Sequence, residues 1–141
     1  MEIYAVKING IENPLGYLYD TLICSWKVRG VSGKKQTNVE IRVALEANMQ
    51  NVIYELNSPE LDSLGVPLKL ELTPHTRYYY QIIVTTDANE TVQSEVCWFE
   101  TAKLAEEWSA NWIGIEENDS IHPEFLKRFS ISKKISQAPL Y

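Results

Sequence analysis

Apolar side chains occupy every second position over long stretches of this chain, which is the spacing of a β-strand with one buried face. The stretch 39–45 shows this most clearly, because Val39, Ile41, Val43 and Leu45 share one face and more polar or smaller residues share the other. No stretch predicts a helix. The same spacing, together with two short apolar runs, predicts strands over 3–8, 22–28, 39–45, 52–55, 66–70, 78–86 and 92–101.

Turn-forming residues separate these runs, at 9–10, 13–16, 30–35, 57–59 and 87–90. Pro67 lies within 66–70, and since proline cannot donate a ladder hydrogen bond, that strand is expected at the edge of a sheet. Trp26 and Tyr80 fall on the inner faces of their strands and are expected in the core. About seven short strands within 101 residues predict an all-β fold, a seven-stranded antiparallel β-sandwich.

The most specific local motif is the segment 72–78, Leu-Thr-Pro-His-Thr-Arg-Tyr. β-Sandwich domains often carry a tyrosine at this kind of corner, and its hydroxyl bonds back to the upstream backbone. Pro74 fixes its own φ and favours an extended Thr73, which suits such a corner. We therefore predict that Tyr78 is a corner tyrosine and that Leu72 and Pro74 have structural roles beside it.

Composition and charge exclude several functions. Hydrophobic residues make up 45% of the chain and charged residues 23%, as in ordinary globular proteins. The net charge is −6 and the 13 basic residues are scattered, which argues against nucleic acid binding. No apolar run is long enough to cross a membrane, and the segment 1–7 lacks the pattern of a secretory signal. If Met1 is the natural start, a cytoplasmic location is expected.

Residues that could carry chemistry are few and far apart. His75 lies in the corner segment and His122 precedes a proline, and neither has a second ligand at a useful spacing. Ser25 and Ser94 have no arrangement of His and Asp around them. We expect no metal, no cofactor and no catalytic residue in this chain. The acidic residues after position 105 are expected to form a solvated connector: Glu106, Glu107, Glu116, Glu117 and Asp119.

The two cysteines, Cys24 and Cys97, both share strand parity with inward aromatic residues. Two interpretations remain open, a disulfide or a pair of buried free thiols. Buried free thiols are favoured, especially in a reducing compartment.

Four aromatic residues are candidates for an interaction surface, namely Tyr79, Trp98, Trp108 and Trp112. They could pack against a neighbouring domain, stack on a sugar ring or complete the core. Docking between domains is the favoured interpretation, since rings that are buried in an interface become exposed patches in an isolated domain.

Several motifs resemble those of fibronectin type III domains over about residues 1–101. This resemblance implies a fibronectin type III or immunoglobulin-like sandwich, and it leaves the function open because that module occurs in proteins of many kinds. The matching residues are Ser25-Trp26, Leu72-x-Pro74-x-Thr76-x-Tyr78, and Ser94 followed by Phe99-Glu100-Thr101.

A second resemblance, to the N-terminal module of bacterial α-L-rhamnosidases, extends over nearly the whole chain. Residues 123–129 and 138–141 resemble the opening strands of that family's next domain, although Pro139 stands where the family usually has a basic residue. The other matching segments are 13–17, 25–28, Gln36 with 41–44, 76–80, 98–101 and the Trp-Ser-Ala-Asn-Trp-Ile-Gly sequence at 108–114.

The second resemblance implies a parent enzyme that removes terminal α-L-rhamnose with inversion, using an acidic pair in an (α/α)6 barrel downstream of residue 141. It also implies a domain order: a sandwich over 1–101, a Trp-containing linker over 102–115, and a truncated, poorly ordered start of the next sandwich over 116–141. This chain would then be a non-catalytic module whose partners are neighbouring domains, with rhamnose-containing glycans met through the parent enzyme. A carbohydrate-binding module and a protein-binding adhesion module are the alternatives.

Overall fold

A computed structural model describes residues 1–16, 18–114 and 124–135 of the chain. It divides into two units, Met1–Ala105 and Glu106–Tyr141, here called the sandwich unit and the C-terminal unit. All of the strands belong to the sandwich unit, and the described residues contain no helix that could span a membrane. The strands are β1 Glu2–Ile8, β2 Leu15–Gly16, β3 Leu22–Arg29, β4 Gln36–Ala44, β5 Val52–Ser58, β6 Val66–Leu68, β7 Arg77–Thr86, β8 Thr91–Gln93 and β9 Cys97–Thr101.

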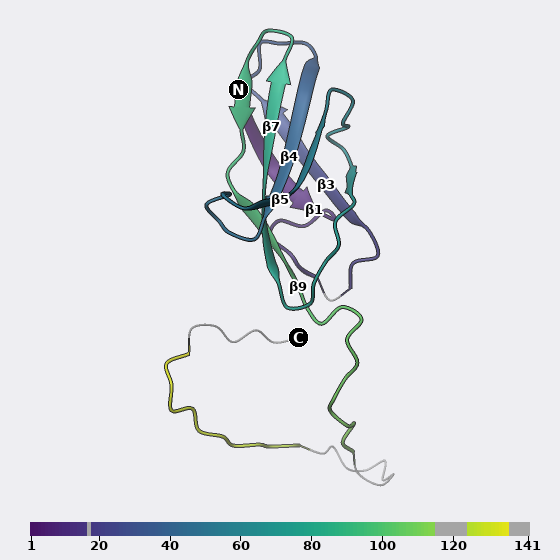
Figure 1. The fold of residues 1–141 in the computed structure, drawn as a ribbon, viewed down its shortest axis with the longest axis vertical. Coiled ribbons are helices and arrows are strands. Elements are labelled where there is room, and N and C mark those ends of the chain that lie inside the picture. The colour runs from purple at the N-terminus through teal and green to yellow at the C-terminus, as the bar shows by residue number, and fades with distance from the viewer. Residues whose placement is uncertain (17, 115–123, 136–141) are drawn as a thin grey trace. The chain divides into compact units, whose positions relative to one another are not determined.

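The strands form two sheets that pack face to face (Figure 1). The smaller sheet has the order β1-β3-β6 and is antiparallel. The larger sheet has the order β2-β9-β7-β4-β5, with β8 also paired to β7. The short β2 runs parallel to β9, whereas the other pairs of the larger sheet are antiparallel. The predicted all-β antiparallel sandwich is therefore confirmed.

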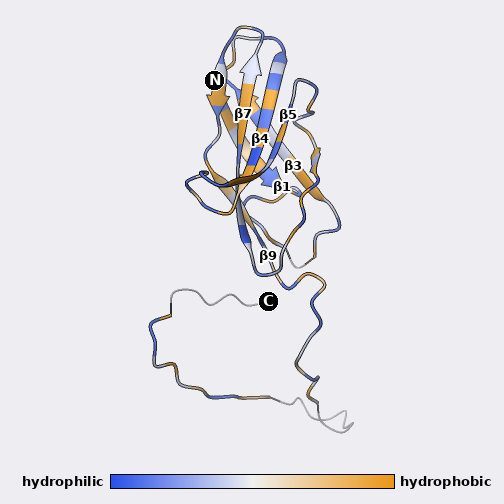
Figure 2. Cartoon of the chain, viewed as in Figure 1, coloured by the Kyte–Doolittle hydropathy of each residue, from blue (hydrophilic) through white to orange (hydrophobic). Residues whose placement is uncertain are grey.

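The core lies between the sheets and follows the period-two pattern of the sequence (Figure 2). Trp26 of β3 faces it from the smaller sheet, and Tyr80 of β7 faces it from the larger one. At one end, the rings of Tyr78 and Phe99 stack with centroids 5.0 Å apart. Buried aromatic rings stabilise the core through the apolar area that they remove from water and through their preferred stacking geometry.

Three features of the larger sheet differ from the prediction. The strand predicted over 92–101 is split into β8 and β9. The Ser94 N–H still donates to Ile82 O at 2.8 Å, but the Ile82 N–H donates to the Ser94 hydroxyl at 3.0 Å and not to its carbonyl. The expected break at 57–59 is wrong at its start, since Asn57 and Ser58 still pair with β4. Leu45 was expected on the inner face but is exposed, because β4 ends at Ala44 after a register shift. The edge position predicted for Pro67 is confirmed, since β3 is the one strand of the described residues that pairs with β6.

The C-terminal unit has no strand among its described residues, 106–114 and 124–135. The described part of the segment that resembles opening strands, 124–129, is exposed coil. The poor order expected for 116–141 falls in part on residues 116–123 and 136–141, which lie outside the described residues, as do His122 and Pro139. The end of the sandwich domain at residue 101, which the resemblance implies, stays a prediction. Ala102 and Lys103, just beyond it, are buried in the sandwich unit.

Candidate functional site

The corner at the end of the core is held by hydrogen bonds among β7, β9 and the segment before β7. The Tyr78 hydroxyl accepts the backbone N–H of Thr73 at 2.8 Å and lies 3.0 Å from the Thr73 hydroxyl. Leu72 and Pro74 are half-buried beside it. His75, in the same turn, has a φ of 51° and donates its backbone N–H to Ala102 O at 2.8 Å. The segment 72–78 is therefore a corner that hydrogen bonds join to β7 and to the end of β9.

Thr101 is a structural residue at this corner that the sequence reasoning did not single out. Its side chain is fully buried, donates to Thr73 O at 2.6 Å and accepts the Thr76 N–H at 3.0 Å. The hydroxyl thus links the end of β9 to both sides of the turn. The only sequence signal is its place in the Phe99-Glu100-Thr101 motif, which carries no information about its partners.

The larger sheet presents Arg77, Tyr79, Trp98 and Glu100 on its outer side, a group that we call the aromatic face. Tyr79 lies opposite Trp98, and Arg77 lies opposite Glu100, in the ladder between β7 and β9. The Arg77 guanidinium lies 4.2 Å from the centroid of the Trp98 ring. A cation over a tryptophan ring is held by the negative face of the π system.

An ion pair fixes the guanidinium of the aromatic face in place. Arg77 Nε and a terminal nitrogen of Arg77 lie 2.8 and 2.7 Å from the same oxygen, Glu100 Oε2. Glu100 is only 5% exposed, so its carboxylate depends on this partner for compensation. The hydrogen bond to Glu100 raises the pKa of Arg77 above its ordinary value. The aromatic face is therefore preorganised, with ring, guanidinium and carboxylate held in one arrangement.

The other two candidate aromatic residues belong to the C-terminal unit. Trp112 is 100% exposed and Trp108 is 59% exposed. With Ala110 and Asn111 they line a hollow of about 250 Å³. The structure thus brings Tyr79 together with Trp98 in the sandwich unit, and Trp108 together with Trp112 in the C-terminal unit.

Within the described parts of the chain, no three His, Cys, Asp or Glu residues gather closely enough to hold a metal ion. Glu106 and Glu107 are exposed. Glu116, Glu117 and Asp119 lie outside the described residues. Rings, a guanidinium and apolar side chains suit burial against another surface, since interfaces are enriched in aromatic residues and arginine.

Both cysteines are free thiols. Cys24 is fully buried between Leu22 and Trp26 along β3, and burial raises its pKa to about 12. Cys97 is half-buried at the start of β9, and burial raises its pKa as well, helped by Glu95 and Glu12. Neither thiol has the lowered pKa of a reactive cysteine.

Two solved α-L-rhamnosidases contain a domain with this fold. The enzyme from Streptomyces avermitilis, solved with L-rhamnose, is 26% identical with a TM-score of 0.69, and the match covers 82% of this chain and 12% of that one. The enzyme from Dictyoglumus thermophilum is 25% identical with a TM-score of 0.69, and the match covers 83% and 14% of the two chains. The present chain therefore spans only a small fraction of either enzyme.

No curated protein is similar enough in sequence to count as a match. The family model for the Rha78A-like, N-terminal immunoglobulin domain matches residues 3–105, nearly the whole sandwich unit. The sandwich, its strand order and the likeness to the two rhamnosidases agree with that match. The chain belongs to the family of Rha78A-like N-terminal immunoglobulin domains.

Proposed function

We propose that this chain is a non-catalytic module of an α-L-rhamnosidase and that it packs against neighbouring domains of the same polypeptide. Its role is to hold the architecture around an inverting catalytic barrel located elsewhere in that enzyme. The family match and the two related rhamnosidases support the choice of parent enzyme.

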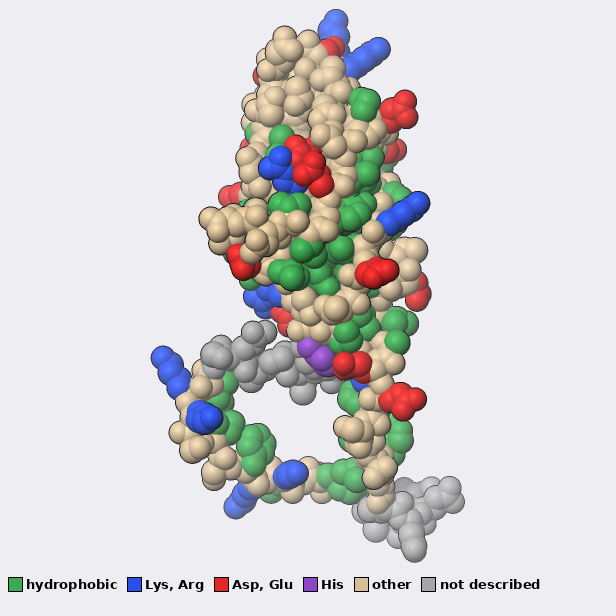
Figure 3. Space-filling model, in the orientation of Figure 1, with side chains coloured by type: hydrophobic (Ala, Val, Ile, Leu, Met, Phe, Trp, Pro, Cys, Tyr) green, Lys and Arg blue, Asp and Glu red, His purple; other side chains and the backbone are tan. Residues whose placement is uncertain are grey.

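The observation that carries the docking role is the exposure of the C-terminal unit. Eight large apolar side chains between residues 108 and 135 are from 54% to 100% exposed. Figure 3 shows such side chains on the surface of this unit, interspersed with Lys and Arg. Exposed apolar surface on this scale supports the docking role, since such surface is typical of interaction sites. The eight are Trp108, Trp112, Ile113, Phe125, Leu126, Phe129, Ile131 and Ile135.

The test is Trp112→Ala in the intact parent enzyme. Removing a tryptophan that is buried between domains costs about 2–4 kcal/mol of docking free energy, so the thermal midpoint of the enzyme should fall measurably. The KM for a rhamnoside should stay the same, because the ring does not contact substrate. Calorimetry and steady-state kinetics give the two readouts.

Leu64→Ala is the matched control, since Leu64 is 82% exposed in a turn of the sandwich unit. It should change neither quantity. An unchanged thermal midpoint for Trp112→Ala would refute docking by this ring.

A sugar-binding role is the second candidate, favoured by the hollow between Trp108 and Trp112. Exposed rings can stack on the apolar face of a pyranose. Titration of the chain with methyl α-L-rhamnoside to about 10 mM, followed by tryptophan fluorescence, detects even a millimolar Kd. Docking predicts no saturable change. A saturable change that Trp112→Ala abolishes would favour sugar binding instead.

A further inference from the structure

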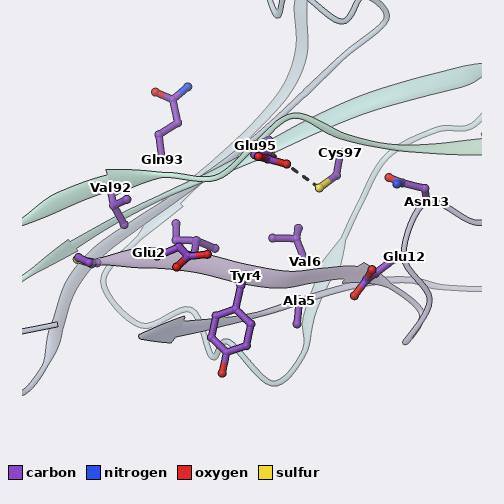
Figure 4. Close-up of a pocket in the computed structure, with 12 residues that line it drawn as sticks. Glu2, Tyr4, Ala5, Val6, Glu12, Asn13, Val92, Gln93, Glu95 and Cys97 are labelled. Atoms are coloured by element: carbon purple, nitrogen blue, oxygen red, sulfur yellow. Dashed lines mark hydrogen bonds between the residues drawn. The ribbon is translucent and has the colours of Figure 1, made fainter. Parts of the chain in front are cut away.

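A groove of about 420 Å³ lies along β1, where the two sheets approach each other without pairing. Figure 4 shows its two walls, with β1 on one side and the segment from Val92 to Cys97 on the other. β1 is the edge strand of the smaller sheet. At its end, Ile8 exchanges backbone hydrogen bonds with Ile11, and the outer side of the strand before that point has no strand paired to it in the described structure. Glu95, in the other wall, lies between β8 and β9 and outside both strands.

The groove exists because β1 is irregular. Its register with β3 shifts between Tyr4 and Lys7, and Ala5 has a φ of 49°, an uncommon conformation for a residue with a Cβ atom. Such a bulge bends the strand and re-aims its side chains. Val6 turns towards the opposite wall and is buried, whereas Tyr4 points away from it (Figure 4).

The side chains of the groove combine an apolar floor with a negative rim. Ile3 and Val6 are buried along β1, and Val92 faces them from β8. Three of the 12 lining residues are glutamates, and none is Lys, Arg or His. Glu2 pairs with Arg29 at 2.7 Å. Glu12 and Glu95 have no ion pair within the described residues.

The two unpaired carboxylates lie around the same thiol. Both Glu95 and Glu12 raise the pKa of Cys97, after the larger effect of burial. The Cys97 thiol donates to the backbone oxygen of Glu95 at 3.8 Å (Figure 4). Cys97 therefore lies between the two negative groups, where it can report whether the groove is occupied.

We propose that this groove binds an extended peptide segment of a partner protein, with Lys or Arg side chains alternating with small aliphatic ones. The aliphatic side chains cover Val6 and Val92, and the cationic side chains meet Glu12 and Glu95. The backbone of the segment bonds to the free edge of β1, as in other cases of strand addition. This inference does not depend on the proposed docking role, which involves other residues.

The test measures how fast iodoacetamide modifies Cys97 in the full chain, followed by mass spectrometry. Cys24 is buried and serves as the internal unreactive thiol. The probe is the acetylated and amidated peptide Lys-Val-Lys-Val-Lys-Val, and Glu-Val-Glu-Val-Glu-Val is its matched control. The lysine peptide should slow the modification saturably, and the glutamate peptide should not.

Two double variants test the charges. Glu12→Gln with Glu95→Gln should weaken protection by the lysine peptide at least about tenfold in Kd, since each close ion pair is lost. Glu46→Gln with Glu60→Gln changes the net charge equally at exposed turn positions and should leave the Kd unchanged. Absence of protection, equal protection by both peptides, or an unchanged Kd in the groove variant would each overturn the proposal.

Discussion

At the scale of the residue, the Tyr78 hydroxyl is a single atom whose removal can be measured. Tyr78→Phe keeps the ring stacked on Phe99 but leaves the Thr73 N–H without its 2.8 Å partner. The free energy of unfolding should fall by about 1 kcal/mol, as for other lost hydrogen bonds. Urea denaturation measures this. Tyr4→Phe, at an exposed ring, should change it by less than about 0.5 kcal/mol, and equal effects of the two substitutions would contradict the corner role.

Because of Cys24, the sandwich should become less stable as the pH rises into the alkaline range. Its pKa is about 12 in the folded protein because of burial, against about 9 for an ordinary thiol. Above pH 9 the unfolded chain loses this proton and the folded chain keeps it, so the free energy of unfolding falls as pH rises through this window. From pH 8 to pH 10 the loss should exceed that of Cys24→Ala by about 1 kcal/mol in urea titrations under reducing conditions. If the original chain and Cys24→Ala lose stability equally between pH 8 and pH 10, Cys24 is not the cause.

At the scale of the element, two carboxylates hold the loop between β3 and β4 against the turn after β7. Asp87 Oδ1 accepts the backbone N–H of Lys34 at 2.8 Å, and Glu90 Oε2 accepts those of Ser32 and Gly33 at 2.9 and 3.2 Å. These two backbone bonds lower the pKa of Glu90. The loop is therefore ordered by the opposite strand connection.

Gly33→Ala should disturb these hydrogen bonds between the loop and the turn after β7. An added Cβ atom would lie 2.6 Å from Thr86 Cβ and 2.7 Å from Asp87 Oδ1, so the loop must move. We expect a loss of about 1–3 kcal/mol, as for other overpacking substitutions. Gly65→Ala is the control, because its nearest contact is an ordinary 3.4 Å to Ile23 Cγ2. Equal urea midpoints for the two variants would argue against tight packing at Gly33.

The sequence was sufficient for the layers of the fold and insufficient for its irregular features. Period-two alternation placed β3, β4 and β7, since burial of one face dictates it. The two-residue β2 has no periodic signal, because it forms only through contact with β9. The pairing of Tyr79 with Trp98 depends on register, and the sequence alone does not give the alignment of two strands. The bulge at Ala5 could not be predicted either, since alanine gives no local sign of a positive φ.

At the scale of the whole molecule, the two units should differ in their resistance to protease. Lys127, Arg128, Lys133 and Lys134 are exposed and lie outside any strand, whereas Lys103 is buried. Limited trypsin digestion should therefore cut first between residues 127 and 135 and leave the sandwich unit intact. Mass spectrometry of the early products checks this. Lys34 and Lys35, in the loop between β3 and β4, serve as the comparison. Cleavage there at the same rate as in the C-terminal unit would contradict the expected order.

The last strand of the sandwich is bonded along both of its edges. β9 pairs with β7 on one side and with β2 on the other, and Ala102 donates to Gly16 O at 2.8 Å just beyond it. Tension applied along the exit of the chain would load these bonds in shear, so that several must break together. A strand held at one edge would instead unzip bond by bond. The module should thus withstand mechanical pulling from its C-terminal side, and any slack between domains would be taken up outside it.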